Sequence, residues 1–456
     1  MKQYKVGMIG LGRFARQFIP LFKAHPLVSE VVLCELRQDV LDSLAKEHEI
    51  ERTFTSHKEL LKSDVDAVAI FTQRWTHAPI ATEALRAGKH VYSAVPAGVH
   101  ADELGELVRA VEETGLTYAL GETSFYRPQT IWCREKFATG DFGRFVYAEG
   151  HYYHNMAHHF YRPFYDANGP EWKSVASVPP MWYISHSASH VLGVTMSRFT
   201  KVSCFGWSDD HEDGIFDRTV SAFDNDFSNQ TALFRTADGG MARINEFRRS
   251  AMGETRQTIA GNKGAYQELP NPEYTRESVE EEMAGKVRKS NTVPRNLAIW
   301  TEERFEHDPR KPDGSYDYEN AQEWHRQIRE DVSYIHQPYP DGIEITEENL
   351  GSLPREYIGR RHMVGNANLP LHRIPKEFVG LPSGHGSGQM LIQDFLEGID
   401  TGKLPPCNVW LAARFSAGAG VAHESSKRDG ELLEVPDFGM PPADKECIDP
   451  IVKLRP

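Results

Sequence analysis

The chain of 456 residues carries a formal net charge of −14, and 40% of its residues are hydrophobic. That charge provides no basic stripe for a nucleic acid, and the length exceeds one typical core, so we expect two domains and a small-molecule substrate. No apolar run is long enough to span a membrane and the first predicted strand begins close to Met1, so we expect a cytoplasmic protein without membrane contacts.

The five cysteines are odd in number, far apart in the sequence and include no C-x-x-C pair. This usage is typical of reduced thiols and excludes a disulfide framework or a cysteine zinc site. We therefore expect no bound metal.

The first predicted element is an apolar strand over residues 4–9, which runs directly into a glycine-containing turn. The turn has the pattern G-x-G-x-x-G/A, in which the glycines allow a tight bend and close approach of a pyrophosphate to a helix N-terminus. The residues that we expect to contact a dinucleotide here are Gly10, Gly12, Arg13, Phe14 and Ala15.

A second apolar run, over residues 31–34, ends in the acidic residue Glu35, about 20 residues after the turn. A carboxylate at this point accepts hydrogen bonds from the adenosine ribose hydroxyls, which favours NAD over NADP. Strand, turn, helix, strand and acid follow in the order that the dinucleotide fingerprint requires. The sequence therefore predicts NAD as the cofactor.

Strand and helix signals continue to alternate as far as residue 120, which is typical of a doubly wound parallel sheet. Pro20 is expected to kink the first helix. We expect a Rossmann domain over residues 1–122, with helices near 40–45, 80–85 and 104–111 and strands at 66–71, 89–92 and 116–120.

Beyond residue 122 the pattern changes to alternating polar and apolar residues, for example at 145–149 and 232–236. Such alternation predicts a large open, mostly antiparallel sheet with one covered face. We interpret residues 123–456 as an α+β domain for substrate binding and oligomerisation. Residues 262–380 are interpreted as an insertion of short helices and ordered loops, and helices are expected at 390–396 and 409–423.

Several short motifs together resemble the Gfo/Idh/MocA oxidoreductase family, whose pattern runs T-P-x-x-x-H and then A-x-x-A-L-x-A-G-K-H-V. The matching residues are Thr72, His77, Ala81, Ala84, Leu85 and the run from Ala87 to Val91, with a late match at 395–405. The resemblance implies cofactor contacts at Thr72, His77 and Pro96, with His77 beside the nicotinamide ribose. It also implies assembly as a homodimer or homotetramer through the outer face of the second sheet.

Typical dehydrogenases of this family place E-K-P after the A-G-K-H-V strand, and the lysine handles the substrate hydroxyl proton. Here the residues are Ala94, Val95 and Pro96, and a valine carries no proton. Members without the lysine include the NAD-dependent glycosidases of glycoside hydrolase family 109, which have a Tyr-Pro-Thr-His motif. The segment from Tyr183 to His186 is similar to that motif, with Ile184 and Ser185 in place of Pro and Thr.

This resemblance implies oxidation of a ring hydroxyl at C3, elimination, addition of water and re-reduction, with NAD recycled. Tyr183 and His186 are then the candidates for proton transfer, and we expect Glu149 to orient one of them or to hold a sugar hydroxyl. His186 and His190 share a helix spacing that also occurs in metal sites, but no H-E-x-x-H pattern accompanies them.

Further residues are predicted to bind the sugar. In a strand, Glu149, His151 and Tyr153 share one face, which we interpret as lining the sugar site, although a solvated histidine patch is an equal alternative. Arg162 is a candidate for an anionic substituent, and His385 lies where the glycosidases have a late H-G-G motif.

Three functions remain open from the sequence. The first is a redox-cycling glycoside hydrolase, and the second is a net NAD-dependent sugar or polyol dehydrogenase in which Tyr183 or His186 replaces the lysine. The third is a non-catalytic NAD-binding regulator, for which the missing lysine is the only argument.

Overall fold

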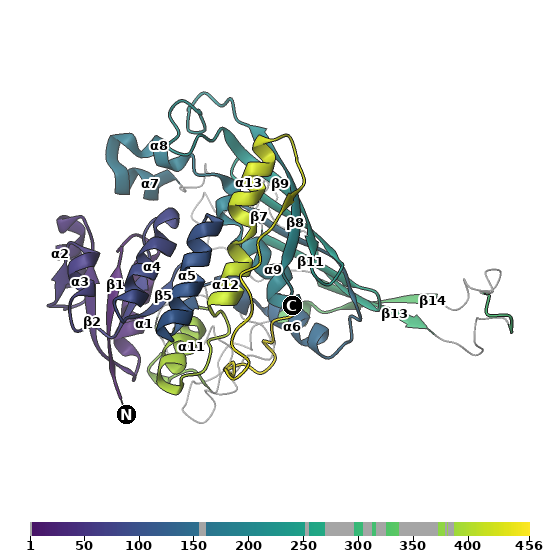
Figure 1. Ribbon diagram of the computed structural model, residues 1–456, viewed down its shortest axis with the longest axis horizontal. Helices are drawn as coiled ribbons and strands as arrows, with labels where there is room; N and C mark the ends of the chain where they lie inside the picture. The colour runs from purple at the N-terminus through teal and green to yellow at the C-terminus, as the bar shows by residue number, and fades with distance from the viewer. Residues whose placement is uncertain are drawn as a thin grey trace, which may run out of the picture.

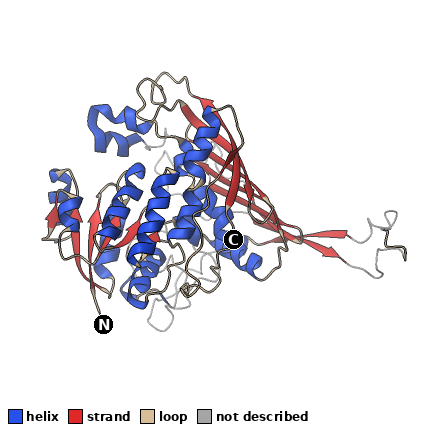
Figure 2. Cartoon of the chain, viewed as in Figure 1, coloured by secondary structure: helices blue, strands red, loops and turns tan. Residues whose placement is uncertain are grey.

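The computed structural model describes residues 2–154, 161–250, 255–269, 296–303, 312–315, 325–336, 373–378, 381 and 387–456. These residues form two β-sheets with helices packed between and beside them (Figure 1, Figure 2). Among them, no helix has the length and apolar content needed to cross a bilayer.

The first sheet, sheet A, has six parallel strands in the order β3-β2-β1-β4-β5-β6. Strands β1 and β4 are apolar along most of their length because helices cover both faces of a parallel sheet. The strands are Tyr4–Ile9 (β1), Val28–Cys34 (β2), Thr53–Phe54 (β3), Ala67–Ile70 (β4), His90–Ser93 (β5) and Tyr118–Leu120 (β6).

The helices of this part follow the predicted order. Pro20 lies in the first turn of α1, directly after a 3-10 turn. A proline at this position interrupts no helical hydrogen bond, so it begins the helix and does not kink it. The helices are Ala15–Phe18 (η1), Ile19–Ala24 (α1), Gln38–Glu47 (α2), His57–Leu61 (α3), Arg74–Thr76 (η2), His77–Arg86 (α4) and Ala101–Thr114 (α5).

The second sheet, sheet B, has nine strands in the order β14-β13-β12-β11-β7-β10-β9-β8-β15. All neighbours are antiparallel except β7 and β10. The strands are Phe145–Tyr153 (β7), Phe199–Ser208 (β8), Phe227–Thr236 (β9), Met241–Phe247 (β10), Thr255–Gly261 (β11), Gly264–Glu268 (β12), Asn296–Glu303 (β13), His325–Asp331 (β14) and Leu433–Glu434 (β15). The predicted fold class, a Rossmann sheet followed by a mostly antiparallel sheet, is confirmed.

Helices cover the face of sheet B that is turned toward sheet A, and among the described residues the opposite face carries none (Figure 2). The central helix α9 is buried at every residue and packs on β7. The helices are Thr123–Tyr126 (η3), Pro128–Ala138 (α6), Tyr161–Asn168 (α7), Gly169–Glu171 (η4), Trp172–Ala176 (α8), Pro180–Tyr183 (η5), Ser185–Thr195 (α9), Ser333–His336 (η7), Lys376–Phe378 (η11), Gly388–Thr401 (α11), Val409–Ser416 (α12) and Gly418–Lys427 (α13).

Two expectations about the second part are wrong. The helix expected over 409–423 is divided at Ala417 into α12 and α13, and a Cβ on Gly418, the first residue of α13, would lie 2.8 Å from the ring of Phe234. The insertion at 262–380 contains the strands β12, β13 and β14, which extend sheet B, as well as short helical turns. Its other residues largely lie outside the described ranges.

Candidate active site

The glycine turn after β1 has the geometry that a dinucleotide requires. Gly10 has φ +83°, and a Cβ there would lie 3.0 Å from the backbone of Phe71 and Thr72, so only glycine fits. A Cβ on Gly12 would meet no atom within 4 Å, so the space before it is open. Ala15 is fully buried where the first helical turn packs on the sheet.

Glu35 closes the other side of this turn. Its carboxylate accepts hydrogen bonds from the backbone N–H of Leu11 at 2.8 Å and of Arg37 at 3.1 Å. Arg13 is exposed, and the ring of Phe14 packs 5.1 Å from that of Phe18. Because the turn is open and flanked by a fixed carboxylate, these residues fit a dinucleotide whose ribose lies at Glu35.

The loops after β4 and β5 are joined by His77. Its Nδ1 lies 2.9 Å from the carbonyl oxygen of Pro96, and its Nε2 lies 3.0 Å from that of Thr72. Burial lowers the pKa of this imidazole. His77 therefore lies between the loops that follow β4 and β5 and connects them, and its contact with the nicotinamide ribose stays a prediction.

A chain of three polar side chains forms the centre of the candidate site. The hydroxyl of Tyr183 lies 3.2 Å from Nε2 of His186, and Nδ1 of His186 lies 2.6 Å from the carboxylate of Glu122. Glu122 is completely buried at the carboxyl end of β6, whereas Tyr183 is half-buried. With the Nδ1 proton directed at Glu122, Nε2 is free to accept the proton of Tyr183, so the three groups form a proton relay.

Local structure fixes this relay. Tyr183 ends the short helix η5, and His186 follows three residues later in the first turn of α9, so the two side chains come close together. The carboxylate of Glu122 also accepts the backbone N–H of Ser124 at 2.8 Å, which caps η3. The relay therefore connects the carboxyl edge of sheet A, where doubly wound folds bind ligands, with α9 of the second part.

A charged cluster borders the relay. The guanidinium of Arg74 lies 4.2 Å from the ring centroid of Tyr183, and the ring of Tyr152 lies 5.2 Å from that of His186. Arg248 forms a 2.9 Å ion pair with Glu246. Burial raises the pKa of Glu246 to about 7, although Arg248 opposes this shift.

The structure separates Glu149 from Tyr183 and His186, so the expectation that it orients one of them is wrong. Tyr152 faces α9, and the adjacent positions of an extended strand point to the other side of the sheet. The carboxylate of Glu149 instead binds Arg243 at 2.8 Å and His151 at 3.0 Å on the outer face.

His151 and Tyr153 lie on the same outer face, as their alternation predicts. Asn245 of β10 joins them, because its amide donates to Nδ1 of His151 at 3.0 Å and to the hydroxyl of Tyr153 at 2.9 Å. They therefore do not line the site around Tyr183. The two other sugar-binding candidates are not placed: Arg162 belongs to α7 but its side chain is outside the described residues, and His385 is outside them altogether.

His190 does not form a metal pair with His186. It is completely buried and its Nδ1 lies 3.4 Å from the hydroxyl of Thr130, whereas His186 is committed to Glu122 and Tyr183. In the described parts of the chain, no three metal-binding side chains converge.

Glu122 was missed by the sequence interpretation. The signal was available, because an acidic residue directly after a predicted parallel strand lies at the ligand-binding edge of the sheet. Arg74 was missed as well, although it lies in the variable part of the T-P-x-x-x-H pattern, directly after the loop that follows β4.

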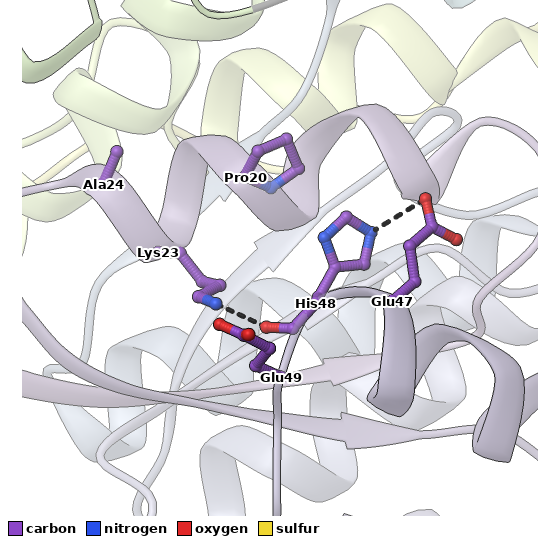
Figure 3. A pocket seen from close by; sticks show the side chains of 6 residues that line it. All are labelled: Pro20, Lys23, Ala24, Glu47, His48 and Glu49. Atoms are coloured by element: carbon purple, nitrogen blue, oxygen red, sulfur yellow. Dashed lines mark hydrogen bonds and ion pairs between the residues drawn. The ribbon is translucent and has the colours of Figure 1, made fainter.

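A hollow of about 290 Å³ lies away from this site, between α1 and the end of α2 (Figure 3). Lys23 binds the carbonyl oxygen of His48, and the imidazole of His48 lies 3.8 Å from the carboxylate of Glu47. These contacts hold the wall of the hollow and include no member of the relay. The lining residues are Pro20, Lys23, Ala24, Glu47, His48 and Glu49.

Comparison with known proteins places the first part of the chain in a family. Residues 4–122 match the model of Gfo/Idh/MocA, described as an oxidoreductase family with an NAD-binding Rossmann fold. The fold and the turn geometry thus define a Rossmann domain of the dinucleotide-binding type. The resemblance seen in the sequence is confirmed over these residues, which match the NAD-binding domain of that family.

Curated relatives match over about a third of their own length. A glycosyl hydrolase family 109 protein of Saccharopolyspora erythraea is 30% identical over 162 residues, 33% of this chain and 35% of the relative. An alpha-N-acetylgalactosaminidase of Shewanella oneidensis is 27% identical over 167 residues, 34% of this chain and 36% of the relative.

Solved structures resemble nearly the whole chain. A levoglucosan dehydrogenase in complex with NADH and L-sorbose has a TM-score of 0.63, and the match covers 96% of this chain and 100% of that one. A scyllo-inositol dehydrogenase of Lactobacillus casei with NAD(H) and scyllo-inositol has a TM-score of 0.59, covering 95% and 99%. Since the identity is 16% in both cases, this likeness establishes the fold alone.

Proposed function

We propose that this protein is an NAD-dependent glycoside hydrolase, which oxidises a sugar at C3, eliminates the aglycone, adds water and reduces the ketone again. The observation that carries the proposal is the relay of Tyr183, His186 and Glu122 at the carboxyl edge of sheet A, together with a buried Val95 where a lysine would be needed. The matches to glycosyl hydrolase family 109 proteins support it.

A bound NAD supplies reversible acceptance of a hydride from C3 of the sugar. We assign Tyr183 to the proton of the C3 hydroxyl, because its own hydroxyl heads the relay. His186 takes the proton of Tyr183 at Nε2, and Glu122 stabilises the resulting imidazolium at Nδ1. The ketone at C3 acidifies the hydrogen on C2. We assign to the same relay the transfer of the C3 hydroxyl proton to the aglycone oxygen as the bond from C1 to that oxygen breaks, and the uptake of the C2 proton in its place.

The cofactor site is tested by Gly12→Asp, which is expected to abolish NAD binding. The new side chain would fill the open space before the turn and bring a negative charge to the pyrophosphate. Isothermal titration of NAD measures the effect, with circular dichroism as the check on folding. A folded variant with wild-type affinity would exclude residues 10–15 as the cofactor site.

The preference for NAD is tested by Glu35→Ala, which is expected to weaken discrimination against NADP. Its carboxylate is held by two backbone N–H groups at the end of β2, where a 2′-phosphate would be repelled. An unchanged ratio of the NAD and NADP dissociation constants would show that another residue, such as Arg37, sets the preference.

The reaction is tested by hydrolysis in deuterated water. Loss and return of the C2 proton is expected to place deuterium at C2 of the released sugar, while net NADH stays near zero. Mass spectrometry and NMR of the sugar, with absorbance at the NADH band, measure both. Unlabelled sugar at full activity would exclude the mechanism.

A net NAD-dependent dehydrogenase of sugars or polyols is the second candidate. The specific observation in its favour is that the relay supplies a proton acceptor in the absence of a lysine. The sugar and polyol dehydrogenases among the similar structures also support this second function. NADH formed in proportion to product, without glycosidic cleavage, would select this function. Either activity would exclude a non-catalytic regulator.

A further inference from the structure

Arg74 lies over the aromatic ring that heads the relay. Its guanidinium carbon is 4.2 Å from the ring centroid of Tyr183, and on another side it lies 5.7 Å from the ring centroid of Phe164. Arg74 is half-buried, so water screens its charge only in part. A cation in this position interacts with the electrons of the ring, and it interacts more strongly still when the ring carries a negative charge.

Arg74 is better placed than Arg248 to act on Tyr183. The guanidinium carbon of Arg248 is 5.9 Å from the centroid of Tyr183, and this side chain is committed to Glu246 by an ion pair of 2.9 Å. Burial raises the pKa of the Tyr183 hydroxyl, and the largest influence against that shift is the charge of Arg74.

Burial also lowers the pKa of Arg74 itself, and the charge of Arg248 lowers it further. Holding a partly desolvated guanidinium beside a second one has a free-energy cost. A negative charge that forms on Tyr183 during the reaction would offset this cost.

We propose that Arg74 is a positioning residue that stabilises the phenolate of Tyr183 and so makes Tyr183 the base of the reaction. Tyr183 gives its proton to Nε2 of His186, and the proton then returns through the same hydrogen bond. The phenolate lies between Arg74 on its ring face and the imidazolium at its oxygen, and Glu122 balances the imidazolium. This role rests on the proposed function for its substrate, but the acidity of Tyr183 is a property of the protein alone.

The test measures that acidity without substrate. Absorbance titration near 295 nm of the wild type, from which the titration of Tyr183→Phe is subtracted, isolates Tyr183 from the other tyrosines. The same difference is then measured between Arg74→Gln and the double variant that carries both Arg74→Gln and Tyr183→Phe. Arg74→Gln is expected to raise the pH of half-ionisation of Tyr183 by about one unit, the shift that a partly desolvated cation–π contact supports.

Two further variants control the result. Arg74→Lys keeps the charge but not the planar stack, so it is expected to give a smaller shift. Arg86→Gln removes an exposed arginine of α4 that is bound to Glu106, and it is expected to give none. An unchanged half-ionisation in Arg74→Gln would overturn the proposal. If Arg74→Gln does not fold, Arg74→Met, which also removes the charge, takes its place, and an unchanged value there would overturn the proposal.

Turnover separates this inference from the proposed function. The acid limb of the pH–rate profile is expected to move with the titration of Tyr183 in Arg74→Gln, whichever product is formed. A shifted titration together with stoichiometric NADH would support the role of Arg74 and reject the hydrolase. Sugar labelled at C2 together with an unshifted titration would support the hydrolase and reject the role of Arg74.

Discussion

The two faces of strand β7 both carry polar clusters, and the clusters differ in what they are attached to. On the inner face, Tyr152 packs on His186 and Tyr183 next to the carboxyl edge of sheet A. On the outer face, Glu149 and His151 bind to neighbouring side chains of sheet B. Histidine and carboxylate content therefore does not distinguish the two faces, whereas proximity to the carboxyl edge of sheet A does.

The largest expected effect comes from breaking the relay on the inner face. Tyr183→Phe and His186→Ala are each expected to lower turnover by about 10²–10⁴-fold, because each removes a proton donor or acceptor and leaves the cofactor site intact. Steady-state kinetics and NAD titration measure the two effects. The matched controls on the outer face, Tyr147→Phe and His151→Ala, are expected to keep near wild-type turnover. Equal losses on both faces would contradict the comparison.

Next in size is the loss of the buried carboxylate. Glu122→Gln is expected to lower turnover by about 10²-fold, because the imidazolium of His186 loses its counter-charge while its hydrogen bond at 2.6 Å keeps a partner of the same shape. Glu149→Gln is the outer-face control. A pH–rate profile measures both variants, and an unchanged profile in Glu122→Gln would remove Glu122 from the relay.

The clusters are also expected to differ in the sign of their pH dependence. Burial raises the pKa of Glu246 from 4.5 to about 7, so between these values the native state binds the proton more tightly than the unfolded state does. Its contribution to stability is therefore present at low pH and lost as the pH rises through 7. The stability difference between Glu246→Gln and the wild type is expected to shift in favour of the variant as the pH rises from 5 to 8.

The pH dependence of stability expected for Glu149 on the outer face has the opposite sign. Burial alone would raise the pKa of its carboxyl, but hydrogen bonds from Tyr147 and His151 and the charge of Arg243 outweigh burial and lower it. Its contribution is present above its ordinary pKa and is lost as the pH falls. Denaturant titrations of Glu149→Gln at several pH values check this, with exposed Glu51→Gln as the control. The same slope for Glu246→Gln and Glu149→Gln would reject the contrast.

The smallest expected effect concerns assembly through the outer face. Four large apolar side chains there are more than half exposed, and an open apolar patch of this kind marks an interaction surface. They are Phe205, Trp207, Leu233 and Met241. We expect a homodimer or homotetramer, and Leu233→Glu is expected to weaken association at least tenfold in light scattering, with exposed Leu36→Glu in the first part of the chain as the control. A wild-type monomer at micromolar concentration would contradict this expectation.

The elements that could be predicted from the sequence are those whose residue pattern is compatible with one local structure. The buried parallel strands of sheet A are continuous apolar runs, and the turn at Gly10 accepts only glycine, so both could be predicted from the sequence. The strands at β12–β14 were not readable, because they are short segments within a stretch rich in Pro, Arg and Glu. β12 pairs with β11 across a two-residue turn, whereas β13 pairs with β12 across a long intervening segment of the chain.

The site was predicted in part for a similar reason. Alternation correctly grouped Glu149, His151 and Tyr153 on one face, but alternation does not tell which face a helix will cover. That choice depends on the packing of α9 against β7. The position of Glu122 directly after a strand was enough to predict it as a site residue. Its pairing with His186 could not be predicted in this way, because the two residues are 64 positions apart in the sequence.

Gly150 lies between the two clusters, at the point where β7 and α9 meet backbone to backbone. A Cβ at this position would lie 2.2 Å from the carbonyl oxygen of Ser187, next to His186, so no side chain separates the strand from the helix. Such a contact transmits displacement almost without loss, because neither backbone has a flexible group that absorbs it. A subunit bound to the outer face of β7 would therefore be expected to shift α9, and with it His186, on the other side of the sheet.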